Sequence, residues 1–162
     1  MTKRRKKYQG PKYISKNPLT TFFGGMSDQH ATHLQSTLLT NHTAMSNMAR
    51  GVGDEHDWDR LNGAINMALV MTEQGIGPEY RDEFKAASQA MLACVRRALK
   101  TNRYLFTGEE LQAMNTALSS HDAQMTCIRS IDVERAANEV MRRLTHRVNV
   151  ASIHEKHPEE VA

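Results

Sequence analysis

Two histidines and an aspartate are the side chains of this chain with the clearest capacity for acid–base or metal chemistry. His42 and His121 each fall among apolar residues at helical spacing, and Asp122 directly follows the second histidine. Residues that recur in this way lie on the inner face of a helix, so the sequence predicts that both imidazoles point into a helical core. Imidazole and carboxylate groups that meet there could transfer protons or bind a metal ion.

The spacing of these residues does not match a known metal-binding pattern. Di-iron bundles carry a glutamate three residues before a histidine, and no histidine of this chain has one. A zinc site assembled from residues far apart in sequence stays open. We favour a structural role, in which His42, Asn115, His121 and Asp122 are buried polar residues. The two histidines would be buried or half-buried, hydrogen-bonded to asparagine or to backbone, and would set the register of helix packing. We expect no metal and no other cofactor.

The stretch GDEHDWD at 53–59 surrounds His56 with four acids. Carboxylates are favourable at a helix start, and Asp54 is suited to cap one, so we interpret the stretch as a helix N-terminus. An acidic contact for a basic partner and a metal site are the alternatives. The chain has no Walker loop, GxGxxG, GxSxG or HExxH motif, and Cys94 and Cys127 lie within predicted helices. We therefore expect two buried, unreactive cysteines and no enzymatic activity.

The first 26 residues are basic and contain no acid. Their cations are Lys3, Arg4, Arg5, Lys6, Lys7, Lys12 and Lys16, and the tyrosines Tyr8 and Tyr13 lie among them. Lysine and arginine neutralise phosphates, and tyrosine can stack on exposed bases, so this arm is predicted to bind DNA or RNA mainly through phosphates. A solubilising tail and a contact with an acidic protein, including a second copy of the chain, are the alternatives. No apolar face accompanies the basic run, which argues against a membrane anchor.

Charge is divided unevenly along the chain. The arm carries seven of the 21 lysines and arginines, whereas the remainder has 14 of them against all 18 aspartates and glutamates. The body is thus predicted to be mildly acidic and the arm strongly basic. The second helix of a helix–turn–helix pattern at 121–140 would begin with Asp132 and Glu134, which would repel phosphates, so we do not predict base recognition by that helix.

Helical periodicity covers the rest of the chain, and no strand pattern competes with it. Breaks fall at Gly51–Gly53, at 75–79, at 101–106 and before Ser130, and Thr107 with Glu110 has capping-box spacing. We predict an all-α fold: an antiparallel bundle of four to five helices at 27–148, an extended arm at 1–26 and a polar tail at 149–162. The predicted inner faces include Ala49, Leu69, Leu99 and Val148.

The chain has 10 methionines, most of which follow these inner faces. We interpret them as residues that fill the core. The more specific alternative is a Met-rich groove that binds a helix of a partner protein.

The segments KRRKKYQGPKYISKNPL, NHTAM (41–45), DWDRLNGAINM (57–67), GIGPEY (75–80) and HDAQ (121–124) resemble an uncharacterised family of small helical proteins from phage, plasmid and other mobile-element regions of Burkholderia- and Pseudomonas-type bacteria. The resemblance implies an accessory or regulatory protein of mobile DNA, and it implies no catalytic residues.

The sequence thus favours a non-enzymatic protein that binds nucleic acid through its arm, with a protein partner or a homo-oligomer also compatible. The alternative is a protein–protein adaptor or inhibitor whose arm and methionines contact a partner. No secretory signal precedes the body, and no apolar stretch approaches the roughly 20 residues of a membrane span, so a cytoplasmic location is expected.

Overall fold

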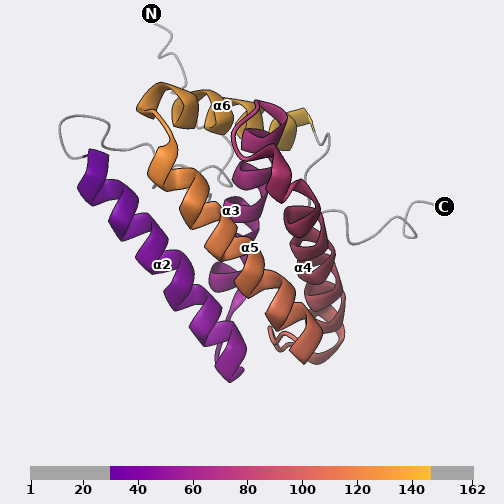
Figure 1. Ribbon diagram of the computed structural model, residues 1–162. Coiled ribbons are helices and arrows are strands. Elements are labelled where there is room, and N and C mark those ends of the chain that lie inside the picture. The colour runs from indigo at the N-terminus through magenta and orange to yellow at the C-terminus, as the bar shows by residue number, and fades with distance from the viewer. Residues whose placement is uncertain (1–29, 147–162) are drawn as a thin grey trace, which may run out of the picture.

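The computed structural model describes residues 30–146 (Figure 1). Within this range the chain forms five α-helices and one short 3-10 helix, and no strand. The elements are α2 (His30–Arg50), α3 (Glu55–Glu73), η2 (Pro78–Tyr80), α4 (Arg81–Thr101), α5 (Gly108–Cys127) and α6 (Ser130–His146). The all-α prediction is confirmed. The predicted arm and tail lie outside the described residues.

Four of the helices form the bundle, and the fifth closes one end of it. Helices α2, α3, α4 and α5 run side by side and alternate in direction, whereas α6 lies across the upper end of the bundle in Figure 1. The turn between α5 and α6 consists of Ile128 and Arg129 alone. The prediction of four to five antiparallel helices therefore holds for four of them, and α6 packs crosswise on α3.

Helix α3 is the centre of the molecule. It packs against α2, α4, α5 and α6, and eleven of its residues are buried, on more than one side of the helix. The run GAINMALVM at 63–71 suits this position because a helix that is apolar nearly all round is stable only where neighbours surround it. The sequence predicted one buried face for this helix, whereas residues on more than one side of it are buried. Leu69, on the predicted face, is only partly buried.

The core divides into two clusters along α3. The larger one lies within the four-helix bundle around the fully buried Trp58, whose indole N–H donates to the carbonyl of Met91 at 3.1 Å. The smaller one lies beneath α6 and joins Met71 and Met125 to Val133 and Val140. Seven methionines are buried in these clusters: Met45, Met48, Met67, Met71, Met91, Met114 and Met125. Core filling thus accounts for them, and the Met-rich groove is wrong for these residues.

Local sequence signals set the helix starts. Asp54 accepts from the backbone amide of Asp57, and the Asp57 carboxylate accepts in return from the amide of Asp54. Thr107 and Glu110 form the predicted capping box at the start of α5. Each reciprocal pair satisfies two backbone donors that a helix N-terminus otherwise leaves open.

Two predicted inner-face residues are exposed. Ala49 lies on the surface of α2, and Leu99 on the last turn of α4 is 48% exposed. Each directly follows a buried residue, Met48 or Ala98, and a step of about 100° round the helix turns the next side chain outward. Val148 lies outside the described residues. None of the helices at 30–146 has the combination of length and apolar character that a membrane span requires.

Candidate functional site

The nine predicted nucleic-acid contacts, Lys3 to Lys16 with Tyr8 and Tyr13, lie outside the described residues. The structure does place the four predicted buried polar residues of the body. It also shows a network of arginines and acids on α6 that the sequence interpretation missed.

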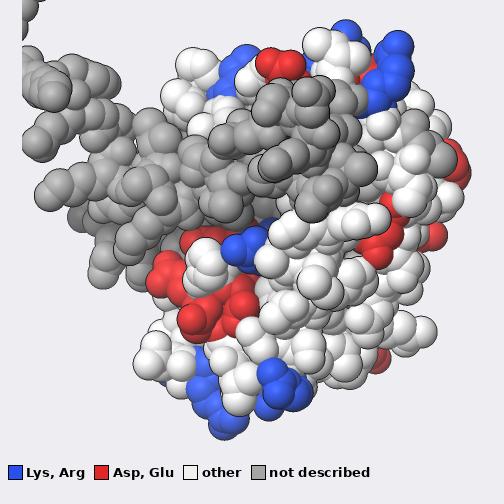
Figure 2. Space-filling view, turned by 90° about the vertical axis from the view of Figure 1, so that its left-hand side faces the viewer, with Lys and Arg blue, Asp and Glu red and all other residues white. Residues whose placement is uncertain are grey.

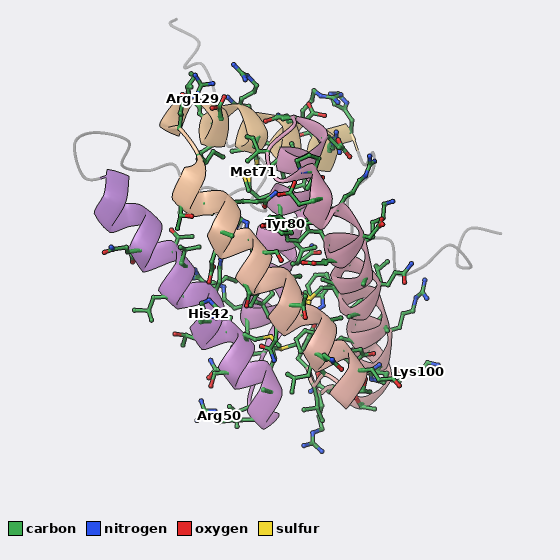
Figure 3. The ribbon with its side chains drawn as sticks, viewed as in Figure 1. His42, Arg50, Met71, Tyr80, Lys100 and Arg129 are labelled. Atoms are coloured by element: carbon green, nitrogen blue, oxygen red, sulfur yellow. The ribbon has the colours of Figure 1, made fainter. Side chains whose placement is uncertain are left out.

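His42 and Asp122 meet across the α2–α5 interface. The Nε2 atom of His42 lies 2.7 Å from Oδ2 of Asp122, which is a hydrogen bond between residues 80 positions apart. Figure 3 shows His42 on α2, beside α5. The two side chains are 47% and 33% exposed. The prediction that His42 is buried is therefore wrong, because Asn41, Ala44 and Met45 occupy the inward positions on this part of α2. Asp122 is only partly buried.

His121 is the buried member of this cluster. Its residue exposure is 1%, as predicted, and burial lowers the pKa of its imidazole to about 4 because the charged form would lose its hydration. The side chain is therefore neutral at pH 7. Its Nδ1 atom and Oδ1 of Asp122 are buried and have no hydrogen-bond partner among the described residues.

The chemistry of this cluster is that of an interhelical contact. The hydrogen bond between His42 and Asp122 joins α2 to α5 at the surface. His121, the preceding residue of α5, is buried and neutral. Across residues 30–146, no three histidine, cysteine or acidic side chains are grouped so that they could hold a metal ion.

Asn115 does not belong to the cluster. It is exposed on α5, so the prediction that it is buried is wrong. The physical reason is helical geometry: six residues separate Asn115 from His121, and six steps of about 100° turn the side chain well away from the face of His121.

The acidic stretch at 53–59 is the start of α3, as predicted. Asp57 belongs to the capping box and also accepts from the side-chain amide of Asn47 on α2 at 3.2 Å. The pKa of the neighbouring Tyr104 is raised, first by burial and then by the carboxylates of Glu55, Asp59 and Asp54. Figure 2 shows acidic side chains gathered above basic ones at the lower end of one face.

Helix α6 begins with a paired acid. Asp132 accepts from Nε of Arg129 at 2.7 Å and from Nη1 of Arg135 at 3.1 Å. The first of these arginines holds the pKa of Asp132 below its usual range. Two guanidinium groups therefore flank the carboxylate of Asp132, and the prediction that this helix start does not recognise bases stays a prediction.

A second cluster lies two turns further along α6. Glu139 accepts from Arg142 at 2.7 and 2.8 Å and from Nε of Arg143 at 2.7 Å, and Arg143 also donates to Glu73 on α3. Hydrogen bonds from Arg142 and Arg143 lower the pKa of Glu139 to about 2. The i, i+3 and i, i+4 spacing of these residues in the sequence could have predicted the pairs on α6.

Comparisons with protein families, with curated proteins and with solved structures find no match to this chain.

Proposed function

We propose that this chain is a non-enzymatic accessory protein of a mobile element that binds nucleic acid through its basic N-terminal arm. The observation that carries the proposal is the segregation of charge. Residues 1–26 contain seven cations and no acid, whereas residues 30–146 contain 12 lysines and arginines against 14 aspartates and glutamates. The net attraction for polyanions therefore resides in the arm.

Five of the ten arginines at 30–146 form ion pairs with acids, which reduces but does not remove their attraction for polyanions. Arg97, Arg129, Arg135, Arg142 and Arg143 are each held in an ion pair with a carboxylate of the body. The arm has no acid within its own sequence that could neutralise its cations in this way. Lysines and arginines of this kind release counterions when they contact phosphates, which makes binding steeply dependent on salt.

The adaptor alternative loses one of its two supports. Seven of the eight methionines among the described residues are buried in the core, and the eighth, Met141, is partly buried. They offer no adaptable Met-rich surface to a partner helix. The arm alone would then have to recognise an acidic protein.

The test is binding to fluorescently labelled single- and double-stranded DNA and RNA of about 20 nucleotides at low salt. The full-length chain is compared with a full-length variant in which the seven basic residues of the arm are replaced by glutamine. We expect the variant to lose most of the affinity, because phosphate contacts dominate such binding. Equal binding by both chains, or no binding by the unmodified chain, would refute the proposal. A protein captured by the unmodified chain after nuclease treatment would then favour the adaptor.

A further inference from the structure

A charged groove lies between the end of α3 and α6. It has a volume of about 430 Å³ and is lined by Val70, Glu73, Gln74, Arg135, Asn138, Glu139, Arg142 and Arg143. The ion pairs of Arg143 with Glu73 and Glu139 join its two walls. Arg143 is only 14% exposed, so it is a structural part of the groove.

Three side chains of α6 that line this groove carry N–H groups that can donate hydrogen bonds to a ligand. Arg135, Asn138 and Arg142 occupy positions i, i+3 and i+7, which share one face of a helix. Arg135 uses Nη1 on Asp132, and Arg142 uses Nε and Nη2 on Glu139. Within the described residues, the Nε and Nη2 atoms of Arg135 and the Nη1 atom of Arg142 have no acceptor.

The acids of the groove are already engaged by arginines. Glu139 accepts from Arg142 and Arg143, and Glu73 accepts from Arg143. Three guanidinium groups and two carboxylates line the groove, and Asp132 beside it is shared by Arg135 and Arg129. This set of four arginines and three acids leaves one positive charge in excess. The ion pairs also hold the arginine side chains in place, so less conformational freedom is lost when a ligand binds.

We propose that this groove holds backbone phosphates of the nucleic acid, with Arg135 and Arg142 as the contacting cations and Asn138 as a neutral donor between them. The inference rests on the proposed function and assigns the body a part in it. Seven residues of helix place the two arginines roughly 10 Å apart along α6, so they can contact two different phosphates of one strand. Contacts of this kind position a nucleic acid without reading its sequence.

The test compares four full-length chains in anisotropy titrations against the same labelled DNA and RNA, over a salt series. The groove variant carries Arg135→Gln and Arg142→Gln, and a charge-retaining variant carries Arg135→Lys and Arg142→Lys. The control carries Arg81→Gln and Arg96→Gln, which removes the same charge from exposed arginines of α4 that do not line the groove. Circular dichroism and thermal unfolding establish that each variant is folded.

The groove variant is expected to bind more weakly and to lose about two units of the slope of log affinity against log salt, one for each phosphate contact. The charge-retaining variant keeps most of the slope, and the control binds like the unmodified chain. Binding by the groove variant that equals that of the unmodified chain, or an equal loss in the control, would overturn the groove assignment and leave the arm's role intact. If the unmodified chain binds neither DNA nor RNA, the proposed function fails and the groove assignment fails with it.

Discussion

Acid should unfold this protein through His121 before it breaks the ion pairs of α6. The imidazole is buried, and its pKa is lowered from 6.5 to about 4 by the loss of hydration. The unfolded chain therefore binds more protons than the folded one between these two values. Stability is at its full value above pH 6.5 and falls as the pH is lowered toward 4, as linkage requires.

The size of this effect follows from the difference of about 2.5 pKa units. Each unit corresponds to 1.36 kcal/mol, so complete titration would cost about 3 kcal/mol, and the part lost between pH 7 and pH 4.5 is about 2 kcal/mol. That is a large fraction of the 5–15 kcal/mol by which domains are typically stable.

The assay is urea unfolding at several pH values, followed by the fluorescence of Trp58, the only tryptophan and a fully buried one. His121→Leu removes the titrating group, and His121→Gln serves as a second variant if leucine does not pack. The carboxylates on α6 titrate in every chain, so the difference between unmodified and variant chains isolates His121. Stability curves that stay parallel from pH 7 to pH 4.5 would refute the reasoning.

Three further predictions concern single residues of the body. A Cβ on Gly53 would lie 2.6 Å from Sδ and 3.0 Å from Cα of Met48, so Gly53→Ala should destabilise the protein by about 1–3 kcal/mol in urea unfolding, whereas Gly108→Ala, with no neighbour within 4 Å, should not. Thr107→Ala removes the cap of α5 and should cost about 1 kcal/mol, measured in the same way against Thr116→Ala on the exposed surface of that helix. The thiol of Cys94 is buried and its pKa is raised to about 11, so in a Cys127→Ala chain it should react with a thiol reagent only after unfolding, and rapid labelling of the folded chain would contradict this.

The elements that the sequence predicted well are those set by neighbouring residues. Both capping boxes depend on pairs three residues apart, Asp54 with Asp57 and Thr107 with Glu110. The turn before α4 depends on Gly77, which has φ of +60°, and on Pro78 at the start of the 3-10 helix. Such signals are complete within a few residues, so no tertiary information is needed to interpret them.

The central position of α3 depended on the packing of the whole chain. Periodicity marks one apolar face, whereas α3 is buried against four other helices, so its second and third faces carry Asn62, Asn66 and Thr72 as buried polar residues. The crosswise packing of α6 could not be predicted either, because it also depends on the packing of the whole chain. Its apolar stripe is compatible with a fifth parallel or antiparallel neighbour as well as with a cap over the end of the bundle.

The polar sites were predicted unevenly. Burial of His121 followed from its spacing among apolar residues, but the pairing of His42 with Asp122 joins α2 to α5 across 80 residues, which no local pattern encodes. Asn115 was misplaced because its proximity to the apolar stripe was given more weight than the turn of the helix between it and His121. The groove was not predicted because its lining comes from both α3 and α6, which no local pattern places side by side.

The salt dependence of nucleic-acid affinity tests the central claim most directly. For the unmodified chain, seven contacts between the arm and B-form DNA would give a slope of about −6 in log affinity against log salt. The account predicts a slope of this order or steeper for the unmodified chain. For the chain whose seven arm cations are replaced by glutamine, it predicts a slope no steeper than about −2, the share of the two groove arginines. A slope near zero in the unmodified chain, or an equally steep one in both, would contradict the assignment of the arm as the nucleic-acid-binding segment.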